Sequence, residues 1–408
     1  MFLPDLVVRS RRTVLATAIR PAALHIRHGK IIGVMDFDDV PEGCPLDDTA
    51  GAVLLPGVVD THVHLNEPDG TEREEFETAT RAAAAGGVTT IIVMPDRGAR
   101  VVTTATALEE RRNAACGECF VDVGFWGGID PAHVAGLGAL AADHVLGFKC
   151  DIAAEIRPAI PVVAKLGLPL LVHAVRPRPI DRPAAASLAH PGWFARLIRA
   201  APGSRKYAAY LAARPKAAEN EAIAAAIDLC RDHRVRMHIL HLSSSDALTP
   251  LYHARVSRLP ISVETCPHYL TVVAEEIPDG APAFLCDPPI RERENREYLW
   301  ASLAGGLIQM VVSDHPHVSS LELSLAATWT EAKARGYSFN QLAEWMCRAP
   351  ARLAGLDRKG AIDVGFDADL TICNPDAAPG ALIERTYLRG TRIYERGKQM
   401  ATPMGNLL

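Results

Sequence analysis

The chain has 408 residues, of which 49% are apolar and 22% are charged, and its formal net charge is −5. This composition supplies a large hydrophobic core and excludes a disordered, collagen-like or coiled-coil protein. The balance of 43 basic against 48 acidic residues argues against a nucleic acid or an anionic lipid surface as a partner.

The sequence predicts a cytoplasmic protein without a membrane anchor. It has no run of about 18 uncharged apolar residues, which a membrane-spanning helix needs. The first residues, MFLPDLVVRSRR, lack the long apolar stretch of a secretory signal. Nine cysteines in such a chain are expected to be reduced thiols.

Both ends of the chain are rich in short β-strand patterns, in which apolar and β-branched runs alternate with turn signals. These runs lie at residues 6–8, 13–15, 23–26 and 31–34, and again at 368–372, 386–388 and 391–394. We expect residues 1–53 and 360–408 to pair into one small β domain, with residues 401–408 as a loosely held tail.

The middle of the chain, residues 54–359, alternates apolar runs with alanine-rich helical patterns. The runs lie at 57–60, 88–94, 121–126, 145–149, 170–173, 236–242, 261–266 and 310–314. The helical patterns lie at 72–85, 103–115, 131–142, 217–232, 244–256, 295–303, 320–335 and 339–353. Eight strands alternating with helices predict a (β/α)8 barrel, in which catalytic groups occupy the C-terminal ends of the strands.

Two of these strand ends carry residues suited to a metal site. His62 and His64 end the first run, and residues two apart on a strand point the same way, so both can bind one ion. Lys149 ends the fourth run, where a buried amine is costly unless it is paired or modified. An ion pair, a Schiff base and a carbamate that bridges two metals are the alternatives that the sequence leaves open.

Three further strand ends add to this set. His173 ends the fifth run, and Asp314 ends the eighth, where it can bind a metal and accept a proton from a bound water. His238 and His241 are three apart, so a regular strand would place them on opposite faces. We expect His241 to reach the barrel interior and His238 to be a hydrogen-bonded core residue. Imidazole and carboxylate ligands suit Zn²⁺, with Mn²⁺, Fe²⁺ or Co²⁺ as alternatives.

Several longer blocks resemble the cyclic-amidase branch of the amidohydrolase superfamily, which includes allantoinase, dihydroorotase and hydantoinase; the allantoinase pattern is the most similar. The resemblance covers nearly the whole chain. The blocks that carry it include PGVVDTHVHLNEP (56–68), AAAAGGVTTIIVMP (82–95), GFKC (147–150), HILHLSSS (238–245), VETCPHYL (263–270), VVSDH (311–315) and KGAIDVGFDADL (359–370).

The resemblance implies a barrel with a β-sandwich made from both termini, and a binuclear zinc site. His62 and His64 would bind one ion, His173 and His241 the other, and a carboxylated Lys149 would bridge the two. Asp314 would bind the first ion and act as general base and acid in opening a cyclic amide. Family members are commonly dimers or tetramers, so a homo-oligomer is expected.

The substrate-facing residues depart from the family pattern. Asn66 stands where dihydroorotases have an arginine that holds a carboxylate, which favours allantoin over dihydroorotate. His268, Asp287 and His317 are the other candidate substrate contacts, and the segment after Asp314 is shortened.

Three alternatives to the allantoinase reading remain open. The first is opening or closure of another ring, such as a hydantoin, dihydropyrimidine or imide. The second is a metal-poor, non-catalytic scaffold. The third is a deaminase of the same superfamily. Lys149 and the cyclic-amidase blocks argue against this third alternative. Tyr207 and Tyr210 are expected on an ordinary helical surface with a few packing contacts.

Overall fold

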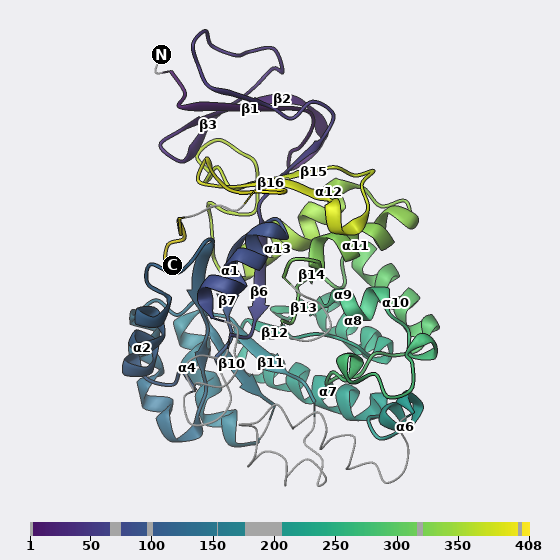
Figure 1. Cartoon of the computed structure of the whole chain (residues 1–408). Helices are drawn as coiled ribbons and strands as arrows, with labels where there is room; N and C mark the ends of the chain where they lie inside the picture. The colour runs from purple at the N-terminus through teal and green to yellow at the C-terminus, as the bar shows by residue number, and fades with distance from the viewer. Residues whose placement is uncertain are drawn as a thin grey trace.

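The computed structural model describes residues 3–65, 75–95, 101–152, 154–175, 206–315, 321–398 and 402–408. Parallel strands in the middle of the chain form one body, and strands from both ends form a sheet at one end of it (Figure 1). The first parallel strand, β6 (Val58–Val63), points away from this sheet. The C-terminal ends of the parallel strands therefore lie on the side remote from the sheet.

The parallel strands form two ladders in the described residues, β6-β7-β8 and β9-β10-β11-β12-β13-β14. Their bounds are β6 Val58–Val63, β7 Val88–Val93, β8 Asp122–Phe125, β9 Gly127–Gly128, β10 Phe148–Asp151, β11 Leu170–His173, β12 Met237–Ile239, β13 Ile261–Thr265 and β14 Met310–Val311. Only Trp126 separates β8 from β9, and its backbone N–H donates to Val93 O at 3.0 Å. These two segments therefore make one strand that joins the ladders.

The ring closes between the first and last parallel strands. His64 N donates to His315 O at 2.8 Å, and Val63 and His315 form a parallel bridge. The described strands thus complete the eight-stranded barrel that the apolar runs predicted, with each strand within a few residues of its run.

Alternate positions along these strands belong to two separate clusters, which explains why the runs are apolar throughout. One cluster fills the barrel and includes Ile92, Leu171, Leu240, Met310 and Val312. The other packs against the surrounding helices and includes Val93, Val172, Ile239, Val263 and Val311.

Helices surround the barrel, and those described overlap each of the predicted helical stretches. Their bounds are α1 Phe76–Ala85, α2 Ala105–Ala115, α3 Leu137–Ala142, α4 Ile160–Leu166, α6 Tyr207–Ala212, α7 Lys216–His233, α8 Leu248–Val256, α9 Pro267–Thr271, α10 Arg293–Ala304, α11 Ser324–Ala334, α12 Phe339–Ala343 and α13 Ala349–Leu353. A π-helical turn, Glu344–Arg348, joins α12 to α13. No helix in the described ranges combines the length and the apolar character needed to cross a lipid bilayer.

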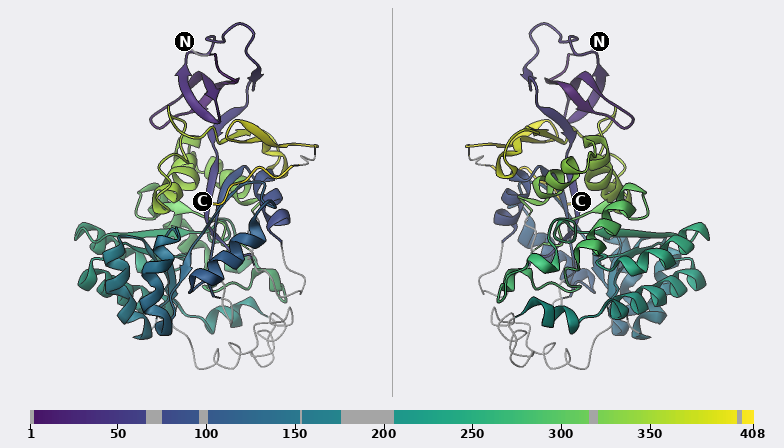
Figure 2. Two further views of the ribbon diagram at one scale, coloured as in Figure 1. Left: turned by 90° about the vertical axis from the view of Figure 1, so that its left-hand side faces the viewer. Right: turned by 90° about the vertical axis from the view of Figure 1, so that its right-hand side faces the viewer.

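Both termini contribute strands to a single sheet, in the order β17-β16-β15-β5-β1-β2-β3 with β4 beside β1. The bounds are β1 Leu6–Val14, β2 Ile19–Arg27, β3 Lys30–Met35, β4 Leu46–Asp48, β5 Val53–Pro56, β15 Leu370–Cys373, β16 Ile383–Leu388 and β17 Thr391–Glu395. Antiparallel pairing of β5 with β15 joins the two halves. The sheet folds over a core that includes Val8, Leu24, Leu54, Leu370 and Ile372, as a β-sandwich does (Figure 2).

One detail of the N-terminal strands differs from expectation. Residues 6–14 form one strand rather than two, because a register shift between Ser10 and Thr13 bends the ladder without ending it. The division of the chain at 53/54 and 359/360 stays a prediction.

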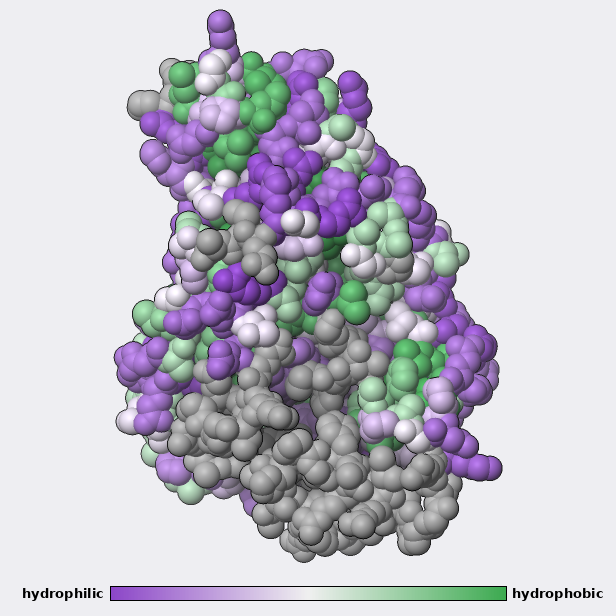
Figure 3. All heavy atoms as spheres, in the orientation of Figure 1, coloured by the Kyte–Doolittle hydropathy of each residue, from purple (hydrophilic) through white to green (hydrophobic). Residues whose placement is uncertain are grey.

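Apolar side chains gather over the N-terminal strands in the space-filling view (Figure 3). Ile19, Ile32 and Leu46 are among the exposed residues of these strands.

The prediction of a loose C-terminal tail is wrong for residues 402–408, which lie along the barrel. Gly405 N donates to Cys119 O at 2.8 Å, and Leu408 N donates to Val123 O at 2.9 Å. A Cβ at Gly405 would lie 2.0 Å from Val121 O, so only glycine permits this approach. Backbone hydrogen bonds to a barrel strand hold the tail, and such contacts with a distant segment leave no pattern in the tail's own sequence.

A buried ion-pair cluster ties the sandwich to the barrel. Lys359 Nζ lies 2.7 Å from carboxylate oxygens of Asp122 on β8 and of Asp369 beside β15. All three side chains are buried. Burial disfavours the charge of Lys359, but the carboxylates outweigh it and raise the pKa of the amine. Arg389 also contacts Asp122, at 2.5 Å.

We expect Lys359→Met to lower the free energy of unfolding by about 3–5 kcal/mol, because two buried carboxylates lose a shared cation. Lys333→Met is the control, since the pair of Lys333 with Asp376 is exposed and its loss should cost less than about 1 kcal/mol. Denaturant unfolding of both variants measures the difference, and equal small losses would contradict the role of the cluster.

Candidate metal and active site

The side chains of His62, His64 and Asp314 meet where β6 and β14 end. One donor atom from each lies within 4.8 Å of the other two. His62 Nε2 is 3.1 Å from Asp314 Oδ1 and 3.3 Å from His64 Nε2. His62 and Asp314 are buried, whereas the side chain of His64 is 23% exposed. Two imidazoles and a carboxylate this close together form a donor set suited to Zn²⁺ and similar ions.

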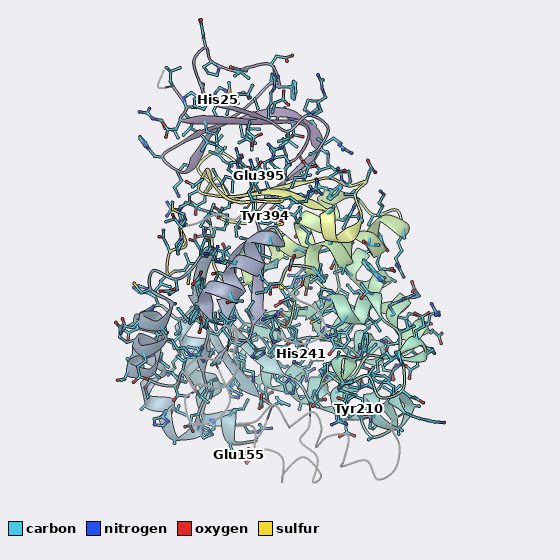
Figure 4. The ribbon with its side chains drawn as sticks, viewed as in Figure 1. His25, Glu155, Tyr210, His241, Tyr394 and Glu395 are labelled. Carbon is cyan, nitrogen blue, oxygen red and sulfur yellow. The ribbon has the colours of Figure 1, made fainter. Side chains whose placement is uncertain are left out.

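A second pair of imidazoles lies beside this group. His173 Nδ1 and His241 Nε2 face each other at 2.7 Å. The ring of His241 is 5.4 Å from that of His62, centroid to centroid, and His241 is labelled in the barrel part of the molecule in Figure 4. The four histidines therefore form one continuous cluster at the C-terminal ends of three strands.

The expectation that only one of His238 and His241 faces the interior is wrong. Strand β12 ends at Ile239, and His241 has a φ of 39°, so the alternation of a strand does not extend to it. His238 pairs in register with Leu171, an interior residue, and both its ring nitrogens are hydrogen-bonded. His238 is thus the buried core histidine that we expected, and the left-handed turn brings His241 into the same interior.

Lys149 lies on β10, in register with the interior residue Leu171. Its side chain is only 9% exposed, and Nζ donates to Asp151 Oδ1 at 2.8 Å. Asp151 is two residues further along, on the same face, and its side chain is 47% exposed. The amine therefore sits inside the barrel next to a carboxylate at its mouth.

Asp60 holds the two strand ends that carry the first cluster. It is buried and accepts hydrogen bonds from His62 N at 3.1 Å and from Ser313 N at 3.0 Å. Burial raises the pKa of Asp60 to about 6, although these N–H donors oppose the shift. Asp314 itself has a φ of 53°, a strained backbone for a non-glycine residue.

Glu264 on β13, which was not among the predicted site residues, is fully buried beneath the histidines. Its Oε1 is 2.5 Å from His62 Nδ1, and its Oε2 is 2.9 Å from His238 Nε2. Burial opposes its charge, but the two imidazoles outweigh it and lower its pKa to about 2. Burial likewise opposes the charge of His62, while Asp314 and Glu264 raise the pKa of that imidazole. Glu264, like Lys149, is a charged residue in an apolar run, and this signal could have found it.

His268 lies beside Asp314, in α9 just after β13. Donor atoms of His268, Cys266 and Asp314 lie within 4.8 Å of one another, and all three residues are buried. Burial is the main cause that raises the pKa of the Cys266 thiol well above its usual value. Burial therefore favours the neutral thiol over the thiolate at this position.

Asp287 lies on a loop that α6 supports. Its side chain is 45% exposed and lies 3.9 Å from Arg214 Nε. Tyr210 donates to Cys286 O at 2.7 Å and Tyr207 to Ile290 O at 3.0 Å. These tyrosines therefore hold the loop, and the expectation of an ordinary helical surface is wrong; Tyr210 is labelled in Figure 4. The remaining candidate contacts, Asn66 and His317, lie outside the described residues.

The chain matches the model of the amidohydrolase family over residues 53–393.

The chain belongs to the amidohydrolase family.

Relatives in this family match it over its whole length. It is 40% identical to an allantoinase from Streptomyces avermitilis, over 99% of this chain and 98% of the relative. An allantoinase from Saccharomyces cerevisiae is 33% identical over 100% of this chain and 99% of the relative. The solved L-hydantoinase (dihydropyrimidinase) from Arthrobacter aurescens superimposes with a TM-score of 0.86 at 27% identity, over 99% of both chains. These similarities confirm the predicted family and the barrel-and-sandwich fold.

The family match and the similarity to the hydantoinase imply a binuclear metal site. The residues present fit such a site. Nitrogen and carboxylate donors converge at the barrel mouth, one group being His62, His64 and Asp314. The facing nitrogens of His173 and His241 offer a second pair of donors. The chemistry of this donor set matches that of divalent transition-metal ions.

Proposed function

We propose that this protein is a metal-dependent hydrolase that opens the ring of allantoin by cleaving a cyclic amide bond. The cluster of His62, His64 and Asp314 at the mouth of an amidohydrolase barrel carries the proposal. Full-length similarity to proteins named allantoinase supports the substrate. The fold alone would not support a particular substrate, since the same barrel fold serves many reactions.

We assign the proposed metal ligands as follows. His62, His64 and Asp314 would hold one ion, His173 and His241 the other, and Lys149, carboxylated by CO₂, would contribute to both. Zn²⁺ is the ion we propose, with Mn²⁺, Co²⁺ or Fe²⁺ as substitutes. Such ions, when bound, polarise the ring carbonyl and lower the pKa of water, which allows amide hydrolysis near neutral pH.

Asp314 is the proposed general base and acid. It is buried among imidazoles at the centre of the site, and its Oδ1 lies 3.1 Å from His62 Nε2. In this position its carboxylate can take the proton from the attacking water and then deliver it to the ring nitrogen that leaves. The positive φ of Asp314 is backbone strain of the kind that clusters at functional sites.

The substrate contacts are proposed as Asn66, His268, Asp287 and His317. His268 has the most direct support, because its imidazole lies beside Asp314. A hydantoin or dihydropyrimidine ring is the second candidate substrate, which the full-length similarity to the Arthrobacter hydantoinase favours. Dihydroorotate is disfavoured, because Asn66 offers no cation for its carboxylate.

We also propose a homo-oligomer, a dimer or tetramer, in the cytoplasm. The nine cysteines lie in the described ranges and none forms a disulfide, which fits a reducing compartment.

The first test measures allantoin ring opening by zinc-reconstituted protein beside its Asp314→Asn variant. We expect turnover by the wild type and a loss of about 10²–10⁴-fold in the variant, because the carboxamide accepts no proton. The variant should keep most of its metal. Turnover within about tenfold of wild type would show that Asp314 is not the base.

The wild-type result separates the alternatives. Absence of allantoin turnover with two metals per chain would move the search to hydantoins and other cyclic amides. Absence of both turnover and metal would favour the non-catalytic scaffold.

Lys149→Ala should bind less than two metals per chain, because it removes the amine that forms the bridging carbamate. Short carboxylic acids such as acetate should restore part of the occupancy and activity. Metal analysis by mass spectrometry gives the readout, and Lys165→Ala, an exposed lysine on the following helix, is the control. Full occupancy in Lys149→Ala would rule out the bridging role.

A further inference from the structure

One buried carboxylate contacts both groups of proposed ligands. Glu264 Oε1 is 2.5 Å from His62 Nδ1, and it also accepts the backbone N–H of His241 at 3.1 Å. His62 belongs to the first proposed ligand group and His241 to the second. Their strands, β6 and β12, are not neighbours in the sheet, so Glu264 joins parts of the site that the barrel ladder does not join directly.

The contact with His62 determines which ring nitrogen of that imidazole can face a metal ion. A carboxylate accepts hydrogen bonds, so Nδ1 of His62 carries a proton, and Nε2 is the nitrogen that can present a lone pair to an ion when the ring is neutral. That nitrogen is the atom that faces Asp314 and His64. A carboxylate behind a ligating histidine fixes its tautomer and orientation in this way.

The contact with His241 supports an unusual backbone. The φ of His241 is 39°, and this conformation turns its ring into the barrel after β12 ends. A non-glycine residue in this region costs free energy, so its neighbours must hold it. The hydrogen bond from His241 N to Glu264 is one such restraint, and Leu242 N donates to Glu264 O at 2.9 Å as a second.

Glu264 is itself held in place from the side away from the ligands. Its Oε2 accepts from His238 Nε2 at 2.9 Å, and His238 Nδ1 lies 2.8 Å from Ser262 Oγ. Ser262, His238 and Glu264 therefore form a chain of hydrogen bonds that leads to His62. Both oxygens of the carboxylate are committed, which leaves it no freedom to rotate.

We propose that Glu264 is the positioning residue that aligns both proposed metal sites, through the ring of His62 and the backbone of His241. The proposal rests on the proposed function, since it assigns Glu264 a task only if two ions bind. Glu264 would not bind an ion itself. Loss of Glu264 should lower the affinity for both ions together, because one carboxylate contacts both ligand groups.

Glu264→Gln tests this with little change in shape. The amide oxygen can still accept from His62 Nδ1 and His241 N, but it carries no negative charge, and His238 can exchange its tautomer to accept from the amide N–H, so the fold should survive. We expect Zn²⁺ dissociation constants for both ions to rise by roughly 10- to 100-fold. They would be measured on metal-free protein by competition with a chromophoric chelator. The absorption spectrum of the Co²⁺-loaded variant should also change, since the ligand geometry is altered.

Two controls separate positioning from general stability. Glu219→Gln changes another buried glutamate, which accepts from Ser243 N and Ser244 N and contacts none of the proposed ligands. It should lower the melting temperature of the metal-free protein and leave Zn²⁺ affinity within about threefold. Ser262→Ala removes only the outer end of the hydrogen-bond chain and should weaken binding least.

The outcomes are distinct. Unchanged affinity in Glu264→Gln, or weakening of one ion only, would overturn the proposal while leaving the hydrolase function intact. A wild-type protein that binds no pair of ions would overturn both. If Glu264→Gln does not fold, Glu264→Asp provides the same comparison, because it keeps the charge but withdraws it from His62.

Discussion

The candidate site depends on the closure of the barrel between its first and last strands. His62 and His64 come from β6, and Asp314 follows β14, so these groups can meet only where the two strand ends are joined. The backbone of His64 bonds to His315, and the carboxylate of Asp60 accepts N–H groups from both strands. These hydrogen bonds thus set the distance between a histidine pair and a carboxylate that are about 250 positions apart in sequence.

Buried charges recur in this molecule, and two of them are each held between two hydrogen-bonding partners. Lys359 lies between two aspartates at the junction of barrel and sandwich, and Glu264 lies between two histidines under the site. An ion of either sign in such surroundings is tolerable only when its partners are held in place. The same constraint therefore fixes the position of one domain on the other and the orientation of the proposed ligands.

Much of the fold and site could be predicted from the sequence, because apolar runs and the polar residues that end them are local patterns. The eight runs gave the strands, and parallel alignment explains why His62, His173 and Asp314 lie at one rim. Other features depend on contacts between distant segments. The direction of His241 follows from a left-handed backbone, and the attachment of residues 402–408 follows from hydrogen bonds to residues near 120. Neither feature is visible in the local sequence. Glu264, in contrast, is visible there as a charged residue within an apolar run.

The pairing of β5 with β15 has a consequence for synthesis of the chain. Leu54 lies opposite Ile372, and the entire barrel is encoded between them. At about 5–20 residues per second on the ribosome, the N-terminal strands wait roughly 15–60 s before their partners emerge. During that interval the apolar face formed by Val8, Leu24 and Leu54 has no cover from the C-terminal strands. The segment that is made first therefore completes its core last, and chaperones have their longest opportunity to bind there.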